Sequence, residues 1–129
     1  MKRFRFDFRH PLATPLLLVG VTPRSSFVDV GQGELRVRFG PWSLQTPLAN
    51  IRGAEVTGPY SALKAIGVRL SFADRGLTFG TTTVAGVCIS FRDAIPAALP
   101  FGLLHHPSLT VTVEDPSRLV QTLNALSKD

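Results

Sequence analysis

Apolar and polar residues alternate along several short segments of this chain, and this pattern constrains the fold more than any other feature. Phenylalanine stands at every second position from 4 to 8, with charged residues between. Apolar and charged residues alternate in the same way over residues 34–39. A period of two is typical of a strand with one buried face. Gly31-Gln32-Gly33 precedes the second segment and predicts a hairpin with residues 26–30.

Further short apolar segments, separated by turns rich in glycine and proline, predict the remaining strands. These segments are residues 16–21, 48–56, 68–72, 77–80, 84–91 and 109–113, with residues 42–46 as a further candidate. Gly53 is a candidate β-bulge. Turns every 8–12 residues or so are typical of a sandwich or barrel. We expect one mainly β domain over residues 1–129, an antiparallel barrel or sandwich of about seven to nine short strands, with residues 1–9 as an accessory strand.

One long helix is predicted near the C-terminal end of the sequence. Asp115 precedes Pro116, which is the order expected of an N-cap and the first helical residue. An apolar stripe follows at helical spacing, formed by Leu119, Val120, Leu123 and Leu126. Because such a stripe must be buried, we expect this amphipathic helix to cover an open end of the barrel.

Composition excludes several classes of protein. Hydrophobic residues make up 44% of the chain and charged residues 18%, which excludes a disordered protein. The single cysteine, Cys88, excludes an intrachain disulfide and a thiolate zinc site, and we expect it to be an inert strand residue. No apolar run approaches the roughly 20 residues of a membrane-spanning helix, and no signal peptide is recognised, so we expect a cytoplasmic protein.

The positive charge is concentrated at the start of the chain. The formal net charge is +5, and the sequence pI is about 10.4. The first nine residues hold three of these five charges, from Lys2, Arg3, Arg5 and Arg9 against Asp7. The high pI therefore gives little support to a nucleic-acid-binding protein. It directs attention to whatever lies beside the N-terminal strand.

Four arginines form the most informative candidate partner-binding set. Arg36 and Arg38 share one face of a predicted strand, and Arg52 and Arg69 on later strands are candidates to join them. Such a patch suits an acidic partner, nucleic acid or an anionic lipid surface, with a solvated sheet face as the alternative. No aromatic residue is expected among them, which argues against single-stranded nucleic acid.

The segment 92–107 is predicted to be a long, proline-broken loop and a second candidate for partner contact. It contains Phe101 and the adjacent pair His105 and His106. Adjacent residues of an extended chain point apart, so we interpret these histidines as loop residues and not as ligands of one metal ion. No cofactor and no metal are predicted.

Several local segments are similar to those of an uncharacterised actinobacterial protein family. They are Val37–Trp42, Pro47–Ile51, Thr57–Tyr60, Ala65–Leu70, Asp74–Thr81, Gly86–Ile89 and His106–Val113. The order of antiparallel strands followed by a C-terminal helix also resembles the bacterial pleckstrin-homology-like (PH-like) fold. This resemblance implies a scaffolding role, because such domains bind phosphoinositides, peptides or their own copies, and few are enzymes.

We therefore expect a non-enzymatic interaction or scaffolding module that contacts a protein partner through its sheet edges, residues 92–107 and the Arg36/Arg38 face. The Phe4, Phe6 and Phe8 strand is expected either to pack on the barrel or to pair with another copy. In the second case, removal of residues 1–9 leaves a folded monomer. The alternative function is a carrier of a small apolar ligand inside the barrel. No cluster of residues points to an enzyme.

Overall fold

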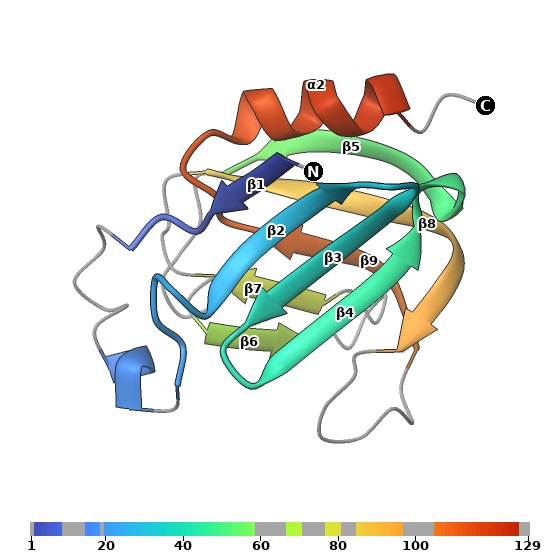
Figure 1. Ribbon diagram of the computed structural model, residues 1–129. Coiled ribbons are helices and arrows are strands. Elements are labelled where there is room, and N and C mark those ends of the chain that lie inside the picture. Colours follow the sequence, from blue (N-terminus) through green and yellow to red (C-terminus); the bar gives the residue numbers. More distant parts are fainter. Residues whose placement is uncertain are drawn as a thin grey trace.

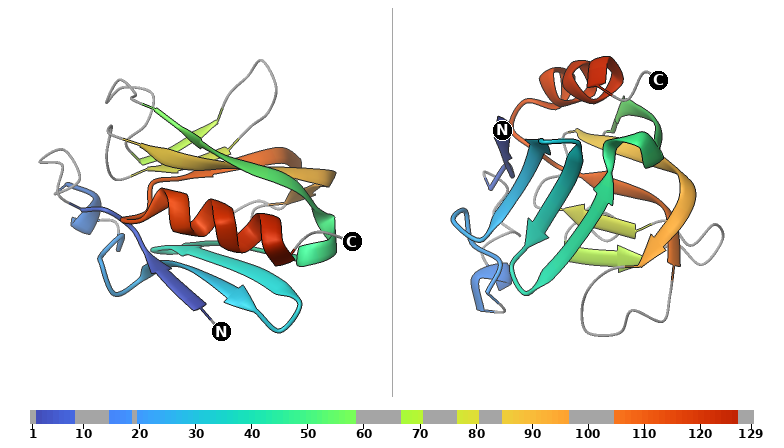
Figure 2. Two further views of the ribbon diagram at one scale, coloured as in Figure 1. Left: turned by 90° about the horizontal axis from the view of Figure 1, so that it is seen from above. Right: turned by 45° about the vertical axis from the view of Figure 1, so that its right-hand side comes forward.

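The computed structural model describes residues 2–8, 15–18, 20–58, 67–70, 77–80, 85–96 and 105–126. These residues include nine strands and a C-terminal helix. The strands form two sheets, one of four strands and one of five. The sheets face each other, and the helix lies across one open side between them (Figures 1 and 2). The expectation of a mainly β protein with one C-terminal helix is confirmed, and the two-sheet sandwich, not a closed barrel, is observed among these residues.

The first sheet is an antiparallel meander in the order β1-β2-β3-β4. Its strands are β1 (Lys2–Arg5), β2 (Ser26–Gly31), β3 (Glu34–Phe39) and β4 (Trp42–Pro47). The predicted β2–β3 hairpin is confirmed. Gln32 and Gly33 have φ values of 55° and 76° in its loop, as the mirror-image turns of tight hairpins require.

The second sheet has the order β5-β8-β9-β7-β6. Its strands are β5 (Ile51–Thr57), β6 (Gly67–Leu70), β7 (Leu77–Gly80), β8 (Gly86–Pro96) and β9 (His105–Val111), and the 3-10 helix η2 (Leu48–Asn50) leads into it. The β5–β8 register shifts between Ile51 and Gly53, at the predicted bulge. The expectation of purely antiparallel sheets is wrong, because β7 and β9 are parallel. Periodicity reports which face of a strand is buried and carries no information on its neighbour's direction.

Aromatic rings occupy the centre of the core between the sheets. Phe39 of β3 lies between Phe6 and Phe79, with ring centroids 5.1 Å from each. Phe6 also forms an isolated antiparallel bridge to Val113, which joins the end of the first sheet to the segment that follows β9. Phe4 and Phe6 are buried and Phe8 packs against the core, so the phenylalanine face of this segment is covered by the rest of the same chain.

The helix α2 (Pro116–Leu126) begins and packs largely as predicted. Its N-cap is confirmed, since the backbone N–H of Arg118 donates to Asp115 Oδ1 at 3.2 Å. Leu119 and Leu123 are fully buried, whereas Leu126 at the end of the stripe is 51% exposed. In the described part of the chain, no helix has both the length and the apolar composition needed to cross a lipid bilayer.

Two local predictions are wrong. Residues 15–18 form a 3-10 turn, which includes the first three residues of the predicted strand 16–21, and Leu18 is 90% exposed. The predicted loop 92–107 is shorter than expected, because residues 92–96 continue β8 and residues 105–107 begin β9. Prolines are compatible with these strand ends, where a missing N–H costs little. The sequence also predicts one helical turn over residues 61–66, with Ser61 as its cap, and this segment lies outside the described residues.

The turn between β3 and β4 depends on Gly40, which gives a first prediction. Its φ is +60°, and a Cβ there would lie 2.8 Å from both the Gly20 oxygen and Val21 Cγ2. We expect Gly40→Ala to lower the free energy of unfolding by about 1–3 kcal/mol in a denaturant titration. Gly33→Ala is the matched control, because φ is +76° there and nothing lies within 4 Å. Equal losses in the two variants would contradict a steric role for Gly40.

Candidate functional site

The outward-facing residues of the first sheet bring four arginines together. The antiparallel register places Arg3, Asp29, Arg36 and Gln45 in one row across the four strands. The next row holds Arg5, Phe27, Arg38 and Ser43. With Glu34, which contacts two of these residues, they form a surface that we call the arginine face. Inward-facing residues of the same strands, such as Phe4, Val28 and Val37, are buried in the core.

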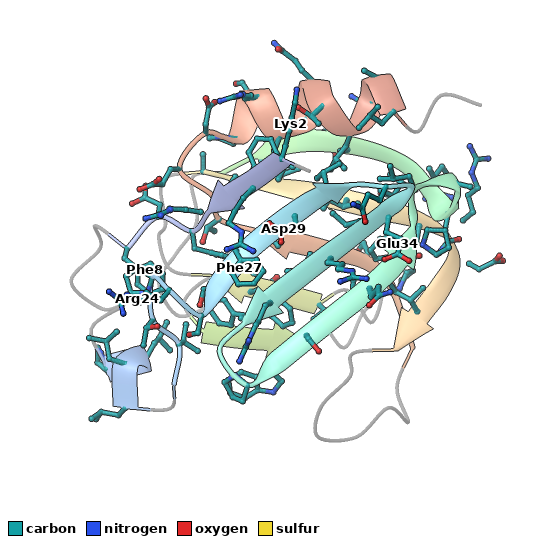
Figure 3. All side chains as sticks on the ribbon, viewed as in Figure 1. Lys2, Phe8, Arg24, Phe27, Asp29 and Glu34 are labelled. Carbon is teal, nitrogen blue, oxygen red and sulfur yellow. The ribbon has the colours of Figure 1, made fainter. Side chains whose placement is uncertain are left out.

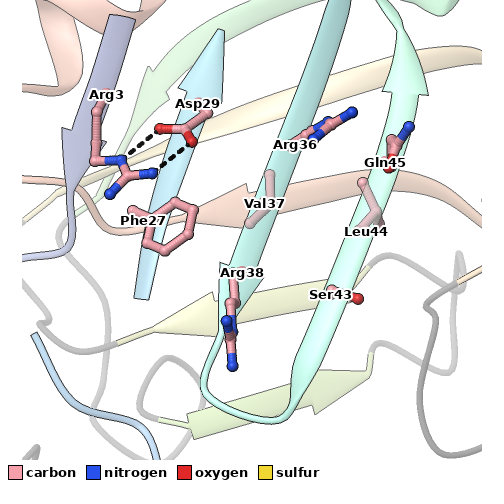
Figure 4. Close-up of a pocket in the computed structure, with 9 residues that line it drawn as sticks. All are labelled: Arg3, Phe27, Asp29, Arg36, Val37, Arg38, Ser43, Leu44 and Gln45. Carbon is pink, nitrogen blue, oxygen red and sulfur yellow. Dashed lines mark hydrogen bonds and ion pairs between the residues drawn. The ribbon is translucent and has the colours of Figure 1, made fainter. Parts of the chain in front are cut away.

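Arg3, Asp29 and Phe27 form a fixed unit at one side of this face. The Arg3 guanidinium donates to both carboxylate oxygens of Asp29, with Nε–Oδ1 and Nη2–Oδ2 distances of 2.8 and 2.9 Å (Figure 4). The carbon of the same guanidinium lies 3.9 Å from the centroid of the Phe27 ring. The hydrogen bond to Asp29, with a smaller contribution from its charge, raises the pKa of Arg3 despite some desolvation. Two-point pairing plus ring stacking holds this cation in one orientation.

Glu34 holds a second pair of residues at the other side of the face (Figure 3). Its Oε2 accepts a hydrogen bond from Arg36 Nε at 3.0 Å and one from Gln45 Nε2 at 3.1 Å. All three side chains are exposed or half-buried. Exposed ion pairs of this kind contribute about 0–1 kcal/mol, so a partner's carboxylate can compete for Arg36 at little cost.

Arg38 and Arg5 carry the most available positive charge on this face. Arg38 Nε donates to the backbone oxygen of Gly40 at 3.2 Å. Within the part of the chain that the structure describes, neither Arg38 nor Arg5 forms an ion pair. Arg36, Arg38, Ser43 and Gln45 line an open pocket of about 300 Å³, together with the Arg3–Asp29 pair (Figure 4). The pocket thus presents guanidinium donors beside small polar side chains.

The structure brings together only half of the predicted arginine set. Arg36 and Arg38 share a face as predicted, whereas Arg52 lies on β5 and Arg69 on β6, both in the other sheet. Arg52 lines a separate pocket of about 320 Å³ with Glu55, Cys88 and Ser90 among others. Cys88 lies in a strand, as expected, and is half-buried, while its neighbours Val87 and Ile89 are buried in the core.

Of the remaining candidates, the structure describes the strand position of the two histidines but not Phe101. His105 and His106 lie at the start of β9, opposite Pro96 and Ile95, and not in a loop as interpreted from the sequence. Phe101 lies outside the described residues. No group of three or more His, Cys, Asp or Glu side chains comes together among the residues whose placement is given.

Sequence reasoning missed Arg3, Arg5 and Phe27 as members of the site. The expectation that no aromatic residue lies on this face is wrong, because Phe27 stands directly opposite Arg38. The alternation in residues 2–8 already placed Arg3 and Arg5 on the outer face of their strand. What it did not supply was the pairing of β1 with β2, which brings that strand beside β3. A comparison with protein-family models, curated proteins and solved structures finds no match for this chain.

Proposed function

We propose that this protein is a non-enzymatic interaction module whose arginine face binds an acidic segment of a protein partner. The observation that carries the proposal is the gathering of four arginines around two carboxylates, Asp29 and Glu34, on one open sheet face. The excess of cations favours an acidic partner, and guanidinium groups bind carboxylates with two parallel hydrogen bonds.

The details of the face favour a protein over nucleic acid or a lipid surface. The only aromatic residue among its members, Phe27, is covered by Arg3 at 3.9 Å, so its ring is occupied and a base would have to displace the cation. Asp29 and Glu34 would repel a continuous row of phosphates. A protein partner presents separate side chains, and its acids can meet Arg36 and Arg38 while avoiding the two carboxylates.

A PH-like architecture is part of the proposal. It is supported by the antiparallel four-stranded meander, the second sheet facing it, and the C-terminal helix across the open side between them (Figure 2). The parallel β7–β9 pair departs from the antiparallel pattern expected of such a fold. The proposed role rests on the chemistry of the arginine face and not on this resemblance.

Two other expectations receive less support. Phe6, Phe39 and Phe79 fill the described centre of the core, where a carrier would need space for its ligand. Phe4 and Phe6 are buried in the chain's own core, so a second copy at this strand would reach only the backbone edge of β1. Both the carrier and the homo-oligomer remain predictions.

A pull-down from the native host tests the proposed function. We expect the protein to capture a partner with an acidic segment, and Arg36→Ala/Arg38→Ala to lose it because the exposed guanidinium groups are gone. Arg52→Ala is the matched control, since Arg52 is an exposed arginine on the other sheet. The captured partner is then purified and its binding measured at low and high salt. Equal binding by all three proteins would contradict the proposal.

A further inference from the structure

We propose that the acidic segment binds as an additional antiparallel strand on the free edge of β4, with its acidic side chains facing Arg36 and Arg38. This inference rests on the proposed function and specifies how the partner docks. Three observations support it, namely the backbone groups that β4 directs outward, the absence of charge on β4, and the position of the arginines one strand behind it.

The first observation is the direction in which the backbone N–H and C=O groups of β4 point. This strand ends the first sheet and pairs only with β3 among the described strands. The backbone N–H of Leu48 donates to the Gly33 oxygen at 2.9 Å, which marks Glu34 and Pro47 as a non-hydrogen-bonded pair. Pairs alternate along an antiparallel ladder, so Ser43 and Gln45 are also in non-hydrogen-bonded pairs. Their N–H and C=O groups therefore point away from β3, towards the open edge.

The second observation is that β4 lacks the charges that protect other edges. Its sequence, Trp-Ser-Leu-Gln-Thr-Pro, contains no charged residue. By contrast, β1 carries Lys2, Arg3 and Arg5 along its edge, and its end is paired through the Glu114 N–H to the Arg5 oxygen at 2.9 Å. At β5, the Asn124 amide of α2 donates to the Ala54 oxygen at 3.3 Å. Charged and covered edges resist strand addition, and β4 has neither protection among the described residues.

The third observation is the charge that lies one strand behind this edge. An added strand would run about 4.8 Å from β4 and about 10 Å from β3. Arg36 extends towards Gln45 and β4, and Arg38 lies opposite the small Ser43 (Figure 4). Residues of the added strand that stand opposite Ser43 and Gln45 share their outer face, within reach of both guanidinium groups. Acidic side chains at every second position fit this surface.

A second copy of the chain is a poorer occupant of the same edge. Pairing β4 with β4 would form one continuous sheet and place two arginine faces beside each other. Like charges close together destabilise such a pairing. The charge of the face therefore favours an acidic partner over self-association.

The test measures binding of a capped eight-residue peptide of alternating Glu and Val by fluorescence anisotropy at low salt. Gln45→Pro removes the N–H that points to the free edge. Pro47, two residues later in the same strand, is also in a non-hydrogen-bonded pair with β3, so β4 already accommodates a proline at this kind of position. We expect Gln45→Pro to bind about tenfold or more weakly than the matched control Gln45→Ala, which loses the same side chain but keeps the N–H. Arg36→Ala/Arg38→Ala should also weaken binding.

A second measurement uses the unmodified protein and two N-methylated peptides. In an antiparallel pair, the residue opposite Gln45 directs its N–H towards β4, so methylation of the Glu nitrogens should abolish binding. Methylation of the Val nitrogens, which point away from β4, should leave binding intact. Because this measurement uses no protein variant, a folding defect cannot account for its result.

Each other result overturns the inference. If both methylated peptides bind equally and the arginine variant binds weakly, strand addition is wrong and the proposed function stands. If the peptide does not bind, or binds equally to all variants, docking of an acidic strand on β4 is wrong. If sedimentation shows a dimer of the 14.0 kDa chain that Gln45→Pro converts to a monomer, the β4 edge holds a second copy instead.

Discussion

Phe39→Ala is expected to lower the free energy of unfolding by about 3–5 kcal/mol, the loss typical of a phenylalanine truncated inside a core. Phe39 is fully buried, and its ring lies 5.1 Å from those of Phe6 and Phe79. These three residues come from the N-terminal segment, β3 and β7, so the ring of Phe39 connects both sheets. Since small domains have about 5–15 kcal/mol of stability, one substitution removes a large part of it.

The measurement is a urea titration followed by circular dichroism, with Phe27→Ala as the matched control. Phe27 is also a phenylalanine of the first sheet, but its ring lies on the outer face under Arg3. We expect Phe27→Ala to cost about 1 kcal/mol or less. A similar cost in both variants would show that the aromatic contacts of Phe39 do not join the two sheets.

Local structure was predictable wherever a residue's surroundings are set by its near neighbours. Alternation identified β2 and β3, glycine placed their turn at Gln32-Gly33, and Asp115 with Pro116 located the start of α2. The limits of β8 and β9 were missed, because Pro96 and Pro107 suggested a loop where they lie in strands. The parallel β7–β9 pair joins segments about thirty residues apart, and periodicity does not encode such pairings.

The candidate site was predictable only within a single strand. The spacing of Arg36 and Arg38 sets their common face, because side chains two apart on a strand point the same way. Whether Arg52 or Arg3 joins them depends on which strands are neighbours. That choice is made by tertiary packing, in which Phe4 and Phe6 are buried and bring β1 beside β2. The same packing therefore decides both the core and the composition of the arginine face.

Removal of residues 1–9 should prevent folding and should not yield the folded monomer expected of a dispensable oligomer edge. Phe4 and Phe6 are 6% and 2% exposed, and each contributes about 3–5 kcal/mol if its truncation behaves like other core phenylalanines. The deletion also removes the bridge to Val113 and leaves the buried Asp29 without Arg3. The combined loss is comparable to the whole stability of a domain of this size.

Circular dichroism and thermal melting of the truncated protein give the result, with Lys2→Ala/Arg5→Ala in the full chain as the control. Lys2 and Arg5 are exposed in the same strand, so this variant should melt close to the unmodified protein. A synthetic peptide of residues 1–8 added to the truncated chain should restore folded signal, because it supplies the two phenylalanines to the open core. If the truncated chain instead melts cooperatively as a monomer, the N-terminal segment is dispensable to the core. The Phe4, Phe6 and Phe8 face is then again a candidate contact between copies.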